Sequence, residues 1–135
     1  CLLAAGDALV HDLGLTSARW QVLGAVAMAQ APSPVAHVAR TMGLSRQNVQ
    51  RIANELAAQD LLAFGDNPHH QRAKLVHPTE RGRSVYASAE RRQAPWSAGP
   101  AAGLPEDAIE EATELMRALR RRLEAGSIEQ DGRPA

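Results

Sequence analysis

Apolar residues recur at helical spacing in two adjoining segments near the middle of the chain. The first segment covers residues 35–42, and the second begins at Ser45. At about 100° per residue, one side of the second segment carries Val49, Ile52, Ala53 and Leu56, as expected of a helix that packs on a core.

The residues around these segments indicate where the helices begin and end. Ser33 is expected to cap the first helix, with Pro34 in its first turn. Gly43 suits the left-handed residue that ends a helix, and Ser45 can cap the next one. Two short helices joined by a tight, glycine-containing turn predict a helix-turn-helix, whose second helix enters a DNA major groove.

The outer side of the second helix is polar and free of acids. By angle, its one acid, Glu55, lies away from that side. Gln and Asn side chains can bond two edge atoms of adenine, and Arg can bond those of guanine. An ordinary solvated helix face is the alternative interpretation. As DNA contacts we expect base readers at Gln47, Gln50 and Arg51, and positioning residues at Ser45, Arg46 and Asn48.

A β-hairpin is predicted directly after this helix. Two short apolar runs, residues 61–64 and 73–79, flank a turn-rich tip with the sequence GDNPHHQR. The far strand is expected to open with Arg72 and Lys74. A basic hairpin beside a recognition helix is a wing that can reach phosphates or the neighbouring minor groove.

Helical patterns flank this unit on both sides. Thr16 is expected to cap a helix over residues 17–29, and Thr79 one that runs to about Gln93, before a loop that holds Trp96. A final helix from about Pro105 has apolar residues three and four apart, a seam for a partner subunit or for the chain's own first helix. The predicted parts are an N-terminal dimerisation helix (1–15), a DNA-binding lobe (16–80), dimerisation helices (81–125) and a flexible tail (126–135).

Composition narrows the function classes. The 135 residues have a formal net charge of zero, yet the segment from Val35 to Arg92 contains nine basic and five acidic residues. Cys1 is the single cysteine, so an intramolecular disulfide and a cysteine-rich zinc site are excluded. Its position, close to the end of the first helix, favours an ordinary cysteine over an oxidant sensor. No membrane span, signal peptide or catalytic motif is found, and a metal site at His69, His70 and His77 is not expected. A cytoplasmic protein without a cofactor or enzymatic activity is predicted.

Three strings carry a resemblance: LTSARWQVLGAVA, VARTMGLSRQNVQRIANELAAQDLL and DNPHHQRAKLVHPTERG. In order and spacing they resemble the MarR family of winged-helix transcription regulators. The resemblance implies a mostly α (α+β) winged helix-turn-helix, a homodimer, and repression at a near-palindromic double-stranded DNA operator, relieved by a small ligand or oxidant. It also implies an effector pocket beside the first helices, where His11 and Trp20 are candidates to hold an aromatic acid or phenol. The family usually has an acid where this chain has His70.

Two other classes of function stay open from the sequence alone. The winged helix can serve as a protein–protein interaction module, with its polar face merely solvated. The chain can also be a ligand or redox sensor for which DNA binding is secondary. A steep loss of DNA affinity with salt distinguishes a DNA-binding protein from the first class, and stabilisation by a ligand would reveal the second.

Overall fold

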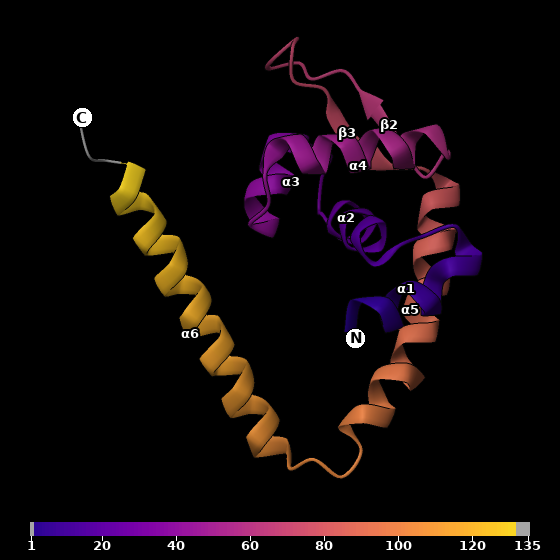
Figure 1. Cartoon of the computed structure of the whole chain (residues 1–135). Coiled ribbons are helices and arrows are strands. Elements are labelled where there is room, and N and C mark those ends of the chain that lie inside the picture. The colour runs from indigo at the N-terminus through magenta and orange to yellow at the C-terminus, as the bar shows by residue number, and fades with distance from the viewer. Residues whose placement is uncertain (1, 132–135) are drawn as a thin grey trace. The chain divides into compact units, whose positions relative to one another are not determined.

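The computed structural model describes residues 2–131, which form six α-helices, one 3₁₀ turn and three short strands (Figure 1). The chain divides into two compact units, Cys1–Trp96 and Ser97–Ala135, described here one at a time. This architecture confirms the predicted mostly α winged helix-turn-helix. The elements of the first unit, in chain order, are α1 (Leu2–Val10), η1 (His11–Leu13), α2 (Ser17–Ala27), β1 (Ser33–Pro34), α3 (Val35–Met42), α4 (Arg46–Ala58), β2 (Leu62–Gly65), β3 (Leu75–Pro78) and most of α5 (Glu80–Ala101).

The helix-turn-helix forms as its local signals predict. Gly43 ends α3 in the left-handed conformation, with φ of 67°. Ser45 caps α4, because its hydroxyl oxygen accepts a hydrogen bond from the backbone N–H of Asn48 at 3.2 Å. The predicted core side of α4 is buried against α2 and α3, with Val49, Ile52, Ala53 and Leu56 each at most 2% exposed.

The start of α3 differs from the prediction. Ser33 does not cap this helix, since its hydroxyl donates to the carbonyl oxygen of Ala31. Ser33 and Pro34 instead form β1, which pairs antiparallel with Val76 and Leu75 of β3. Pro34 occupies an edge strand of a sheet with the order β1-β3-β2, where a residue without a backbone donor is tolerated.

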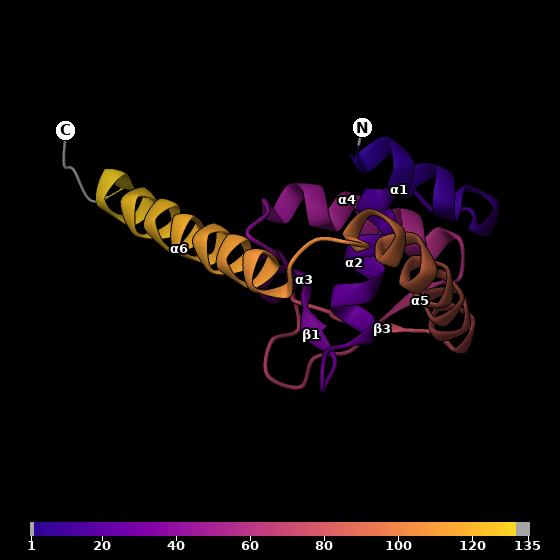
Figure 2. The ribbon, with the colours of Figure 1, turned by 90° about the horizontal axis from the view of Figure 1, so that it is seen from below.

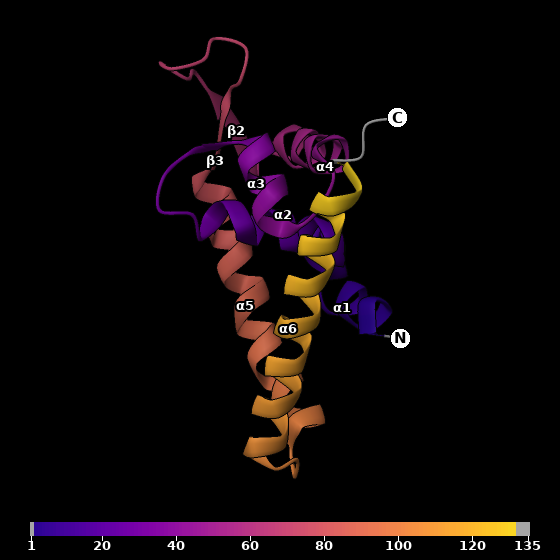
Figure 3. The ribbon, with the colours of Figure 1, turned by 90° about the vertical axis from the view of Figure 1, so that its left-hand side faces the viewer.

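The wing is a hairpin with a nine-residue connection between its paired strands. Strands β2 and β3 pair from Leu62 opposite Pro78 to Gly65 opposite Leu75. The far strand therefore begins at Leu75, and Arg72 and Lys74 lie in the loop rather than at the start of the strand. Figure 3 shows this loop extending beyond the helices of the first unit.

The core of the first unit is aliphatic. Helix α2 lies at its centre and contacts α1, α3, α4 and β3, as the view from below in Figure 2 helps to follow. Thr16 caps α2 as predicted, by accepting from the backbone N–H of Arg19. The largest fully buried side chains are Val10, Val22, Leu23, Val49, Leu56, Leu61, Leu62 and Val76.

Helix α5 is longer than predicted. Thr79 begins it as expected, since its hydroxyl accepts from the backbone N–H of Gly82 at 2.9 Å. The helix then continues through Pro95 to Ala101, so Trp96 is helical and does not lie in a loop. A proline removes one backbone donor from a helix, and α5 accommodates both Pro95 and Pro100 near its C-terminal end.

The second unit is dominated by α6 (Glu106–Asp131). This helix passes Gly126, where the flexible tail was expected to begin, and residues 132–135 of that tail lie outside the described part of the chain. The predicted apolar seam is present and exposed, at Ile109, Leu115, Met116, Leu119 and Leu123. A helix with such a face is usually covered by another helix.

Candidate nucleic-acid interface

A groove of about 300 Å³ lies between α4 and the wing. Arg46 and Gln50 reach it from α4, and Arg72 and Lys74 reach it from the wing loop. Phe64 of β2 and residues around β1 supply its apolar part. Four of the predicted DNA contacts thus share one concave surface, with three cations and no acid among its lining residues. Such a surface suits a phosphate backbone.

A second, shallower hollow lies on the outer face of α4 alone. Its lining residues are Arg46, Gln47, Gln50, Arg51 and Asn54. Gln47 and Arg51 therefore lie beside Gln50, the third predicted base reader. Ser45 and Asn48 line neither hollow, and both make hydrogen bonds within the protein at the start of the helix.

The polar side chains of α4 form hydrogen bonds with one another. Gln50 Nε2 donates to Asn54 Oδ1 at 3.0 Å. Arg51 donates to Asn48 Oδ1 at 3.0 Å and to Glu55 Oε1 at 2.6 Å. Glu55, which the helical angle alone places away from the DNA-reading side, therefore contacts a residue expected to read bases.

Glu55 also joins the recognition helix to α2. Arg19 donates through both Nε and Nη2 to Glu55 Oε2, at 3.0 and 2.9 Å. Hydrogen bonds from Arg19 first, and then from Arg51, hold the pKa of the Glu55 carboxyl below its usual value. The carboxylate stays charged and is shared by two guanidinium groups, so that the orientation of Arg51 depends on α2.

Comparison with known proteins places this lobe in a family. A model described as "MarR family" matches residues 13–73, from the end of η1 into the wing loop. The winged-helix lobe belongs to the MarR family. Solved structures similar to the chain include MarR-family transcription regulators, and the chain has their fold.

Individual relatives differ in how much of their sequence and fold they share with this chain. An uncharacterized protein of Mycobacterium tuberculosis is 39% identical over 84 residues, which cover 62% of this chain and 57% of that protein. A SlyA-like regulator from Listeria monocytogenes has a TM-score of 0.85 at 18% identity, covering 99% and 89% of the two chains. CouR from Rhodococcus jostii RHA1, bound to p-coumaroyl-CoA, has a TM-score of 0.77 at 23% identity, covering 87% and 82%. At these identities the solved structures establish the fold alone.

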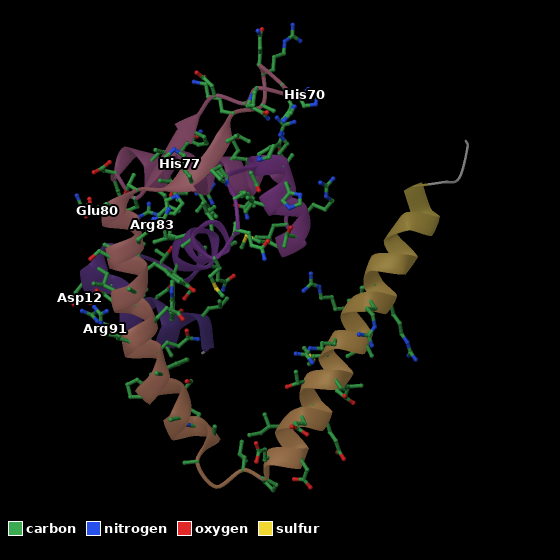
Figure 4. The ribbon with its side chains drawn as sticks, turned by 180° about the vertical axis from the view of Figure 1, so that it is seen from behind. Asp12, His70, His77, Glu80, Arg83 and Arg91 are labelled. Carbon is green, nitrogen blue, oxygen red and sulfur yellow. The ribbon has the colours of Figure 1, made fainter. Side chains whose placement is uncertain are left out.

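The wing loop of this MarR-family lobe is held by Asn67, which the sequence indicated only as one of several turn residues. Asn67 is 8% exposed, its amide donates to the Ala73 carbonyl oxygen at 2.9 Å, and its Oδ1 accepts from the His69 backbone N–H at 3.0 Å. His70, in place of the usual acid, is exposed and bonds back to Asn67 through its backbone N–H. Figure 4 shows His70 in the loop and His77 nearer the helices. A buried Asn beside a Pro is typical of a structured turn.

Two of the remaining expectations concern ions and membranes. Within residues 2–131, no group of three His, Cys, Asp or Glu side chains is arranged to hold a metal ion. None of the helices described is long and apolar enough to cross a membrane. Cys1, whose redox role was considered, lies outside the described residues.

The two candidate effector residues, His11 and Trp20, do not lie at the same site. Trp20 lines a cavity of about 480 Å³ formed by α1, α2 and α5 together with Met42. His11 is exposed in η1 and is not among the residues that line this cavity. Trp96 lines the cavity instead. The sequence did not indicate this, because Trp96 was expected to lie in a loop. The MarR-family lobe therefore has a cationic groove and a separate, largely apolar cavity.

Proposed function

We propose that the chain is a sequence-specific regulator of transcription that binds double-stranded DNA as a homodimer in the cytoplasm. The observation that carries this proposal is the groove in which Arg46 of the recognition helix meets Arg72 and Lys74 of the wing. These cations come from two separate elements and face one concave surface, and its lining contains no acid. A merely solvated helix face gives no reason for that convergence.

The proposed contacts divide by chemistry. Gln47, Gln50 and Arg51 lie on the outer face of α4 and would read base edges, and Arg72 and Lys74 would contact phosphates or the minor groove. Ser45 and Asn48 would act at the start of α4, where Ser45 sets the helix end and Asn48 orients Arg51.

The exposed apolar face of α6 supports dimerisation. Five large apolar side chains on this helix are at least 41% exposed, and a second copy of the chain would cover them. Two recognition helices in a dimer occupy successive major grooves about 34 Å apart, so the operator is expected to be a near-palindrome. We infer repression that is relieved by a small aromatic ligand. The p-coumaroyl-CoA complex of a protein with the same fold supports this inference.

The test is selection of duplexes from a random pool, followed by measurement of affinity at increasing salt. We expect an inverted repeat to be enriched, bound by two chains, and to lose affinity steeply as salt rises. Weak binding with neither a selected sequence nor a salt dependence would refute the proposal and favour a protein-interaction module. A size measurement by light scattering of the protein alone tests the dimer independently of DNA.

A further inference from the structure

The cavity formed by α1, α2 and α5 collects most of the chain's aromatic side chains. The sequence contains two Trp, one Tyr and one Phe. Trp20, Tyr86 and Trp96 all line this cavity, together with Met28 and Met42, two of three methionines. Trp20, Met42 and Tyr86 pack against the edge of the aliphatic core and remain partly exposed.

The cavity has the size and lining of a ligand site. Its volume of about 480 Å³ lies within the range of roughly 300–1,000 Å³ that is usual for small-molecule pockets. The three aromatic side chains are only partly buried, so their faces are accessible. Methionine side chains adapt to ligands of different shape and make favourable contacts with aromatic rings.

The charge of the cavity lining is negative. Among its described lining residues only Glu90 carries a charge. Asp7 lies beside it and accepts a hydrogen bond from the backbone N–H of Ser17, another lining residue. Of the arginines next to lining residues in the sequence, Arg19 pairs with Glu55 and Arg92 with Asp12, and Arg91 donates to the Ser88 hydroxyl. Burial, and then the negative charge of Glu90, raise the pKa of the Tyr86 hydroxyl, which fits this picture.

We propose that this cavity binds an aromatic cation, whose positive charge lies between the tryptophan faces and Glu90. Tryptophan is the best aromatic partner for a cation, and a quaternary ammonium group is the kind of ligand that aromatic side chains recognise without a hydrogen bond. An aromatic acid would bring its carboxylate towards Glu90, and the lining has no basic side chain to offset the repulsion between the two negative charges. The expectation of an aromatic acid depended on His11, which the cavity does not include.

This inference rests on the proposed function only where the ligand is said to control DNA binding. The test therefore measures ligand binding without DNA. The probes are (2-naphthylmethyl)trimethylammonium and 2-naphthylacetate, which share a ring system and carry opposite charges. Isothermal titration calorimetry on the full chain gives the affinity of each. We expect the cation to bind at least about fivefold more tightly than the anion.

Variants locate the site. Glu90→Gln keeps the shape of the side chain and removes its charge, so the preference for the cation should fall several-fold. Glu80→Gln, in the same helix but outside the cavity lining, should leave the preference unchanged. Trp96→Leu should weaken both probes, with thermal unfolding used to show that the variant is folded.

Each result of this experiment decides something. Equal binding of the two probes, tighter binding of the anion, or no binding of either probe at millimolar concentration would overturn the proposal. A preference for the cation that survives Glu90→Gln would also overturn it. If the cation binds here but the chain binds no DNA, the cavity assignment stands and the proposed regulatory function fails. If the chain binds DNA but not the cation, the regulatory function stands and the cavity assignment fails.

Discussion

Lys74 provides the sharpest test of the proposed DNA-binding groove, because it is the chain's only lysine and one of three cations in the groove lining. We consider Lys74→Ala. If each of the three cations neutralises one phosphate, a dimer neutralises six, and the slope of log affinity against log salt is about −5.4. The variant neutralises four, which gives a slope of about −3.6.

These slopes translate into a difference that is easy to measure. Between 50 and 200 mM salt, the parent should lose affinity by about 2,000-fold and Lys74→Ala by about 150-fold. Fluorescence anisotropy with a labelled operator duplex, at five salt concentrations, measures both slopes. Any further phosphate contacts steepen both lines equally, so the difference between the slopes remains the quantity to compare.

Arg91→Ala is the matched control. Arg91 is exposed on α5, donates to the Ser88 hydroxyl and is not part of the groove lining, and Figure 4 shows it well away from the wing. Its removal changes the net charge of the chain by the same amount and should leave the slope at the parent value. A Lys74→Ala slope equal to that of the parent, or an equal change in Arg91→Ala, would refute the assignment of the groove to phosphate contact.

Three further predictions concern the framework around this groove. Glu55→Gln should raise affinity for unrelated duplexes by removing a negative charge. It should also reduce discrimination between sequences several-fold, because Arg51 keeps its hydrogen bond to Asn48 but loses its charged partner. Unchanged discrimination in competition assays would contradict this. Gly82→Ala should lower the free energy of unfolding by about 3 kcal/mol or more, because its Cβ would lie 1.9 Å from the Leu61 carbonyl oxygen. Gly99→Ala has open space around its Cβ and should raise the free energy of unfolding by up to about 1 kcal/mol. Equal urea midpoints for the two variants would disprove the close packing. A hydrogen bond from Arg92 lowers the pKa of Asp12 below its usual 3.8. The contribution of this ion pair to stability is therefore present above the unfolded pKa and is lost as the pH falls through the lower pKa of the folded state. The urea midpoint should therefore decline more steeply below pH 5 in the parent than in Asp12→Asn, and parallel declines would argue against the ion pair.

Features set by neighbouring residues could be predicted from the sequence. The left-handed Gly43 and the Ser45 cap depend on contacts within a few residues, and both are present as expected. The buried side of α4 follows from helical periodicity, which a single segment displays in full. The resemblance to a known family added the order of helix, wing and following helix.

Features set by distant residues could not be predicted. β1 forms because Ser33 and Pro34 meet β3, more than forty residues later in the chain. Arg19 and Glu55 are separated by 36 positions, so that nothing local indicates their ion pair. The cavity needs three helices to bring Trp20, Tyr86 and Trp96 together, and a helix boundary misplaced at Pro95 removed Trp96 from consideration.

The gathering of both tryptophans at one cavity gives the protein an optical property. Tryptophan dominates the intrinsic fluorescence of a protein, and both tryptophans of this chain line the same cavity. The groove and the outer face of α4 contain no tryptophan among their lining residues. Quenching or a spectral shift of the tryptophan fluorescence would therefore indicate a ligand or a structural change at the cavity. A change in fluorescence on addition of DNA would indicate that DNA binding at the groove alters the cavity. Neither measurement requires a label.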